Sequence, residues 1–163
     1  MSKVELQRSG LSRKRALSLQ AAFHLAQRSR FHRLPEVWRL RASREVFDYF
    51  GERLSDLKRE CFWSLLLDGK NRISRVVRIS EGSLTSSLVH PREVFRPAVL
   101  EAAASVLFIH NHPSGDPTPS QEDIDVTRRL VETGRILGIK VLDHIIVGFH
   151  RYFSFADQGL LQL

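Results

Sequence analysis

The sequence predicts an α/β fold, with α+β character, in which helices flank a mixed sheet. Short runs of branched and aromatic residues alternate along the chain with longer stretches whose apolar residues recur at helical spacing. A chain of 163 residues with 42% hydrophobic content is enough for one globular core, and no apolar run is long enough to cross a membrane. Both features indicate a single domain built on a sheet.

The expected elements follow one another from residue 43 onward. An amphipathic stretch predicts a helix at 43–58, which leads into apolar strands near 61–68 and 72–80. Further elements are a helix at 92–104, a strand at 104–109, a helix at 121–137, a strand at 140–147 and a short strand at 151–155.

The strand at 104–109 leads directly into two histidines. Side chains alternate along an extended chain, so His110 and His112 point the same way while Asn111 points elsewhere. The following segment, Pro113 to Pro119, holds three prolines and a glycine, which predict a stiff loop. The two imidazoles can therefore reach one ion at the end of the strand.

The helix expected at 121–137 begins with a capping signal. Ser120 stands at the N-cap position and Asp123 follows three residues later, ahead of an apolar stripe at helical spacing. The first helical turn can bring Asp123 back toward the histidine pair. A plain capping box is the alternative interpretation of Ser120 and Asp123, and the two interpretations are compatible.

Two histidines and one carboxylate predict a catalytic rather than a structural zinc site. They leave the fourth tetrahedral position for water, whose pKa falls to about 7 on zinc. Such chemistry also needs a general base, a carboxylate near the water but not bound to the metal. The alternative for His110 and His112 is that they merely close a strand, and Ser120 and Asp123 argue against it.

These motifs resemble a known family. The pattern His110-x-His112, seven residues, Ser120, two residues, Asp123 resembles the JAMM (MPN+) metalloprotease motif. The resemblance implies that the two histidines and the aspartate hold Zn²⁺ and that Ser120 supports the oxyanion. The segments 88–95, 110–123 and 142–146 are similar to the bacterial RadC family, with a likeness from about Ser43 to Leu161. It implies a JAMM/MPN, cytidine-deaminase-like sheet flanked by helices.

The resemblance also implies a general base. The family's catalytic glutamate lies at the end of a helix just before a strand, and Glu60 occupies that position here. Glu81, in an expected turn, and Glu93, in the His-Pro-Arg-Glu segment, are the alternatives. Two nearby residues receive structural interpretations: His144 is expected to be a core histidine satisfied by hydrogen bonds, and Cys61 a buried, inert thiol.

The function expected from these residues is zinc-dependent hydrolysis. The residues alone indicate metal-assisted hydrolysis, and the resemblance implies a metallopeptidase or isopeptidase that acts on peptide or protein substrates. The alternative is a DNA-associated protein in repair or recombination, either a metal-dependent nuclease or a non-catalytic DNA-binding module. A nuclease often needs a second metal ion, for which Asp116 and Asp125 lie close enough in sequence. Substrate identity and oligomeric state stay open.

Charge divides the chain into a basic segment at 1–42 and a metal-hydrolase domain at 43–163. The formal net charge is +7, and residues 1–44 hold eleven of the 25 Lys and Arg but only two of the 18 Asp and Glu. The segment is expected to form a basic helix with an arm that contacts nucleic acid or another anionic surface, or else simply aids solubility. No helix-hairpin-helix module of the kind common in the RadC family is recognisable. A cytoplasmic bacterial location without membrane contact is expected.

Overall fold

A computed structural model describes residues 12–15, 17–19, 21–22, 38–82 and 89–161 of the chain. The chain divides into two compact units, residues 1–38 and residues 39–163. In the first unit, residues 13–15, 17–19 and 21–22 are helical and solvent-exposed, and the rest of the expected basic arm lies outside the described residues. No helix in the described ranges is long and apolar enough to cross a membrane.

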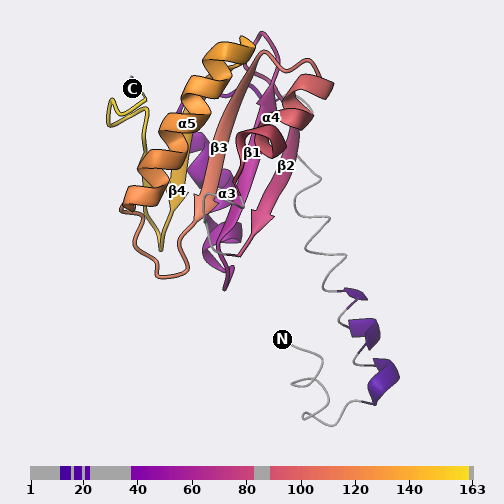
Figure 1. The fold of residues 1–163 in the computed structure, drawn as a ribbon. Helices are drawn as coiled ribbons and strands as arrows, with labels where there is room; N and C mark the ends of the chain where they lie inside the picture. The colour runs from indigo at the N-terminus through magenta and orange to yellow at the C-terminus, as the bar shows by residue number, and fades with distance from the viewer. Residues whose placement is uncertain (1–11, 16, 20, 23–37, 83–88, 162–163) are drawn as a thin grey trace. The chain divides into compact units, whose positions relative to one another are not determined.

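The second unit is built on a mixed sheet (Figure 1), which confirms the predicted fold class. Among the described residues the sheet has five strands in the order β2-β1-β3-β4-β5. Their bounds are β1 Cys61–Leu67, β2 Ile73–Glu81, β3 Ser105–Asn111, β4 Lys140–Val147 and β5 Tyr152–Ser154. The central strand β3 runs antiparallel to β1 and parallel to β4. All seven residues of β1 and all seven of β3 are buried, as expected for the middle of a covered sheet.

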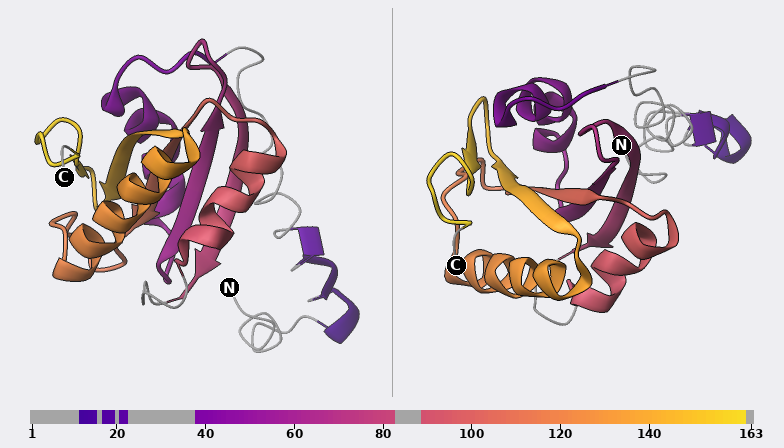
Figure 2. Two further views of the ribbon diagram at one scale, coloured as in Figure 1. Left: turned by 45° about the horizontal axis from the view of Figure 1, so that its top comes forward. Right: turned by 90° about the horizontal axis from the view of Figure 1, so that it is seen from above.

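Helices cover both faces of the sheet (Figure 2). Helices α4 (Pro91–Leu100) and α5 (Gln121–Leu137) lie on one face, and α3 (Ser43–Ser55) lies on the other. An apolar core lies under α4 and α5, where Phe62 of β1 and Phe108 of β3 meet Phe95 of α4 and Leu130 of α5. Helix α3 lies on the opposite face, and its buried side chains include Val46, Phe50 and Leu54. This two-sided burial fixes the register of β3 and hence the direction of its side chains.

The structure confirms the predicted order of elements and adjusts several bounds. Helix α5 and strand β4 have the predicted bounds. Helix α4 ends at Leu100 rather than Ala104, because Ala102 takes a left-handed conformation (φ 50°) that no helix continues. Strand β3 extends past Ile109, because His110 and Asn111 still pair with β4.

Candidate metal centre

The end of β3 places two alternate side chains on the same side of the sheet. His110 pairs with Phe62 on one side and Ile146 on the other, so its backbone is fixed by both neighbouring strands. His112, one residue beyond the strand, stays in line because its N–H donates to the Val147 carbonyl at 2.9 Å. The alternation of the extended chain then turns His110 and His112 toward α5, as the sequence predicted.

The start of α5 brings the carboxylate. The Ser120 hydroxyl accepts from the Asp123 N–H, and the Asp123 side chain accepts from the Ser120 N–H at 2.7 Å, which is the predicted capping box. The Ser120 hydroxyl also donates to Asp123 Oδ2 at 2.7 Å. Asp123 Oδ2 is therefore held by two donors, and Oδ1 is turned toward His110.

His110, His112 and Asp123 form a candidate metal-binding triad. Their ligand atoms lie within 4.8 Å of one another, and no second group of three such residues occurs in the part of the chain that the structure describes. The two Nε2 atoms are 3.0 Å apart, and they lie 3.2 and 3.4 Å from the nearest Asp123 oxygens. Ligand bonds of about 2.0–2.1 Å at tetrahedral angles separate neighbouring ligand atoms by roughly 3.3 Å. The three donors therefore fit one tetrahedral ion.

A chain of hydrogen bonds determines which nitrogen of His110 is available for a metal. His110 Nδ1 lies 2.8 Å from His144 Nε2, His144 Nδ1 lies 2.6 Å from Thr127 Oγ1, and the Thr127 hydroxyl donates to the Asp123 carbonyl at 2.5 Å. The Thr127 proton is used by that carbonyl, so His144 Nδ1 must donate to Thr127 and His144 Nε2 must accept from His110. His110 Nε2 then carries a lone pair that faces Asp123 and His112.

His112 is oriented by the loop that follows it. Its Nδ1 lies 2.7 Å from the Asp116 carbonyl, which can only accept, so Nδ1 carries the proton and Nε2 is free to bind a metal. Hydrogen bonding of the second ring nitrogen in this way is usual for metal-ligating histidines. The Asp116 carboxylate caps Thr118, and Asp125 contacts Gln121 and Arg128, so neither joins the triad.

Electrostatics favour a charged carboxylate between neutral or cationic imidazoles. Burial acts to raise the pKa of Asp123, but its close contacts with the His110 and His112 rings, together with the hydrogen bond from the Ser120 hydroxyl, hold that pKa well below its usual range. Burial lowers the pKa of His110, which therefore stays neutral and keeps its single ring proton on Nδ1. For His112, burial acts to lower the pKa, and the hydrogen bond with Asp123 and the contact with the Asp116 carbonyl raise it overall. The triad thus carries one fixed negative charge, which suits a cation.

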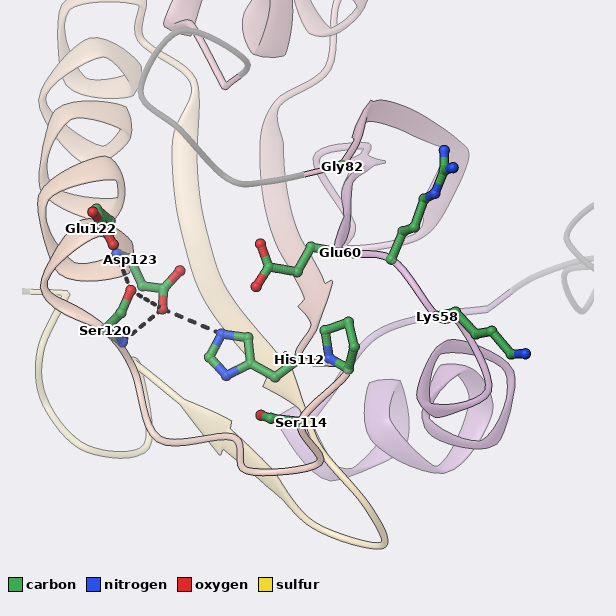
Figure 3. Close-up of a pocket in the computed structure, with 10 residues that line it drawn as sticks. Lys58, Glu60, Gly82, His112, Ser114, Ser120, Glu122 and Asp123 are labelled. Atoms are coloured by element: carbon green, nitrogen blue, oxygen red, sulfur yellow. Dashed lines mark hydrogen bonds and ion pairs between the residues drawn. The ribbon is translucent and has the colours of Figure 1, made fainter.

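Glu60 faces the triad across a cleft of about 720 Å³ (Figure 3). It directly precedes β1, and its carboxylate extends toward His112 and Asp123, which come from the other wall. Ser120 also lines this cleft. The two alternative bases do not: Glu81 pairs with Arg78 at 2.7 Å, and Glu93 pairs with Arg92 at 3.2 Å.

Four residues around the triad can be compared with what the sequence predicted for them. His144 is a buried histidine with both ring nitrogens hydrogen-bonded, as predicted, and one of its partners is His110. Cys61 is buried as predicted, and burial raises the pKa of its thiol. Sequence reasoning assigned no role to Thr127, and none to Asn111 beyond its direction. Thr127 lies one helical turn after Asp123, and this spacing could have indicated that its hydroxyl bonds to the Asp123 carbonyl.

Comparison with known proteins agrees with this geometry. The mixed sheet, the flanking helices and the triad define a JAB/MPN-like domain, which is a metal-dependent hydrolase-like and metalloprotease-like fold. The model of the RadC-like JAB domain family matches residues 40–160, and the chain belongs to the RadC family.

Relatives extend over almost the whole chain. A UPF0758 protein of Trichlorobacter lovleyi is 59% identical over 158 residues, which is 96% of this chain and 69% of that protein. A UPF0758 protein of Pelobacter propionicus is 57% identical over 93% of this chain and 66% of its own length. One from Methanosarcina mazei is 43% identical over 96% and 69%, respectively. The chain thus spans about two thirds of the length of these relatives.

Proposed function

We propose that this chain is a zinc-dependent hydrolase that cleaves peptide or isopeptide bonds. The observation that supports this most directly is the pairing of the His110, His112 and Asp123 triad with Glu60 across one cleft. Three protein ligands are typical of catalytic zinc, whereas structural zinc usually has four. A carboxylate opposite such a set, from the residue that precedes β1, is suited to general base catalysis.

Each residue has a separate task in this proposal. His110 and His112 hold zinc through Nε2, and Asp123 holds it through its carboxylate. Zinc in this position supplies Lewis acidity that polarises a carbonyl oxygen and activates water. The Glu60 carboxylate accepts the proton of the attacking water and returns it to the leaving amine as the C–N bond breaks.

Ser120 has two tasks in succession. Its hydroxyl donates to Asp123 Oδ2 and so holds the carboxylate in place. Rotation about the Cβ–Oγ bond directs the same proton into the cleft, where it stabilises the oxyanion. The capping bond from the Asp123 N–H to Ser120 Oγ survives this rotation, because Oγ itself does not move.

Elemental analysis tests the metal. We expect about one zinc per chain in the purified protein and none in Asp123→Ala, with circular dichroism used to show that the variant is folded. A folded wild-type protein that takes up no metal even in added zinc would remove the hydrolase proposal. The preferred ion is decided in the same experiment by loading with zinc, manganese and cobalt in turn.

A cleavage assay tests the role of Glu60. Peptide and isopeptide libraries are incubated with wild type, with Glu60→Gln and with the matched control Glu81→Gln, all loaded with zinc. Loss of a general base lowers rates by about 10²–10⁴-fold, so cleavage should fail in Glu60→Gln alone. Equal cleavage by both variants would contradict the assignment.

A second candidate function is contact with nucleic acid through the basic segment. Arg13, Lys14 and Arg15 are exposed on a helix in residues 1–38, which form a unit of their own. Exposed clusters of this kind bind phosphate backbones by counterion release. Binding of branched and single-stranded DNA should weaken steeply with salt and disappear when residues 1–34 are deleted. Binding that is insensitive to both changes would leave the segment a solubility role.

A further inference from the structure

The side chain of Asn111, between the two histidines, contacts the segment that carries Glu60. Asn111 is fully buried, and it turns away from the triad because neighbouring side chains on a strand alternate. Its Oδ1 accepts from the Cys61 N–H at 2.9 Å. Its Nδ2 donates to the Arg59 carbonyl at 3.0 Å and to the Leu57 carbonyl at 3.4 Å.

These contacts enclose Glu60. The Arg59 carbonyl and the Cys61 N–H belong to the two peptide groups on either side of Glu60, and one amide group binds both. The Glu60 carbonyl in turn accepts from the Gly82 N–H at 2.8 Å. The backbone of Glu60 is therefore fixed from β3 on one side and from the end of β2 on the other.

Only a primary amide fits this position. The site needs one acceptor for the Cys61 N–H and two donors for the carbonyls of Leu57 and Arg59, and asparagine supplies both kinds. An aspartate would place an anionic oxygen against two carbonyl oxygens. The partners also settle which atom of the amide is oxygen, because a carbonyl cannot donate.

We propose that Asn111 is a positioning residue that sets the place of Glu60 relative to the metal centre. This rests on the proposed function, in which Glu60 is the general base. The tripeptide His110-Asn111-His112 would then carry two metal ligands on one side of the strand end and the anchor of the base on the other. One rigid strand thereby fixes the distance between base and metal, as catalysis by proton transfer requires.

Hydrogen exchange of the metal-free protein tests whether the Asn111 side chain holds the backbone around Glu60. Asn111→Ala is compared with wild type and with Val106→Ala, a lesion in the core at the far end of the same strand. After correction for global stability, the amides of Cys61 and Gly82 should exchange at least about tenfold faster in Asn111→Ala and not in Val106→Ala. Gly82 is decisive, because it binds Glu60 and not Asn111. Unchanged protection at Gly82 would overturn the proposal. Asn111→Leu, which has a similar volume and brings no charge, replaces Asn111→Ala if that variant does not fold.

Cobalt loading tests the consequence for the site. The protein is labelled with ¹³C-glutamate, and the NMR signal of the Glu60 carboxyl is assigned by its absence in Glu60→Gln. Bound cobalt broadens this signal in proportion to r⁻⁶, where r is the distance between the cobalt ion and the Glu60 carboxyl carbon. We expect Asn111→Ala to bind the same amount of cobalt as wild type but to show at least twofold less broadening. Equal broadening would overturn the positioning role. Failure of wild type to bind cobalt would instead overturn the metal centre, and hydrogen exchange would still decide whether Asn111 holds Glu60.

Discussion

At the scale of single residues, the unusual feature of the site is a histidine that is oriented by another histidine. His144 is fully buried, and burial holds its pKa well below the usual range. It is therefore neutral and can accept the Nδ1 proton of His110, while its own Nδ1 donates to Thr127. The relay ends at the carbonyl of Asp123, so it connects two of the three proposed ligands. Removing one member should disturb both.

His144→Ala should weaken zinc binding. The variant leaves His110 Nδ1 without its acceptor, and loss of such a partner typically reduces metal affinity by about 10–100-fold. Competition titration against a zinc-binding dye measures the change. His150→Asn is the matched control, because His150 is exposed, has a left-handed φ of 56° that asparagine tolerates, and should bind zinc as wild type does. Wild-type affinity in His144→Ala would show that the relay does not support the ligands.

Asp143 gives a test of pH dependence. Burial raises the pKa of its carboxyl above 3.8, although Ser154 and the Ala156 N–H donate to it. As pH rises, the Asp143 carboxyl therefore ionises at a lower pH in the unfolded chain than in the folded protein. The free energy of unfolding should fall between pH 3.8 and the raised pKa of the folded state, and it should stay lower above that pKa. Asp143→Asn should lack this fall. Urea denaturation of both metal-free proteins over this pH range measures the difference between their unfolding free energies. Contributions from the other titrating groups are common to both proteins and cancel in this difference. Parallel curves would contradict the assignment.

Much of the triad could be predicted from the sequence, because its spacing reflects strand and helix geometry. His110 and His112 are two residues apart on a strand, and Asp123 lies in a first helical turn. Glu60 was assigned by resemblance, because it meets the triad only through the pairing of β1 with β3. Asn111 contacts Cys61 fifty residues away, and a contact at that separation leaves no local pattern.

At the scale of elements, the loop after β3 is fixed by its fit against the turn between β4 and β5. The Phe149 N–H donates to the Gly115 carbonyl at 2.9 Å. A Cβ atom on Gly148 would lie 2.4 Å from the Gly115 oxygen and 2.7 Å from Pro117 Cδ, so the two backbones meet too closely for any side chain. This loop carries the Asp116 carbonyl that orients His112. The packing of the turn between β4 and β5 therefore affects the orientation of His112 in the candidate metal centre.

Gly148→Ala should destabilise the fold and weaken metal binding together. Overpacking against backbone atoms typically costs about 1–3 kcal/mol, and displacement of the loop would loosen the contact between Asp116 and His112. Chemical denaturation and zinc titration measure the two effects. Gly69→Ala is the control: a Cβ atom added there would meet no atom within 4 Å apart from its chain neighbours, so the stability of this variant should stay within about 0.5 kcal/mol of wild type. A destabilised Gly148→Ala with unchanged zinc affinity would separate the loop from the site.

The elements themselves could be predicted where the pattern was long and flanked by clear signals. Helix α5 has a capping box at its start and Gly138, with a φ of 70°, after its end, so both limits were readable. The end of α4 was not, because Glu101 to Ala104 are good helix formers by composition. The left-handed conformation of Ala102 instead turns the chain back toward the sheet, where the Ala104 N–H donates to the Leu67 carbonyl. Tertiary contacts thus overrode local preference.

At the scale of the whole molecule, the proposed metal ligands come from both the sheet and a helix that covers it. His110 lies on the central strand of the sheet, and Asp123 lies on the helix that covers one face. An ion bound to both would link the sheet to α5 in the native state, and the unfolded chain would lose this arrangement of ligands. Metal binding should therefore be coupled to the stability of residues 39–163 as a unit.

Zinc should raise the unfolding free energy, and residues 39–163 should be sufficient for the effect. At a free zinc concentration about 100 times the Kd, linkage gives about 2.7 kcal/mol of stabilisation. Denaturation of the full chain and of residues 39–163, each with zinc and with chelator, measures the gain. We expect the same gain in both, because all three ligands and the residues that orient them lie within this range. Asp123→Ala should show none. A gain confined to the full chain would mean that the basic segment contributes to the metal-bound state, and the division into independent units would then fail.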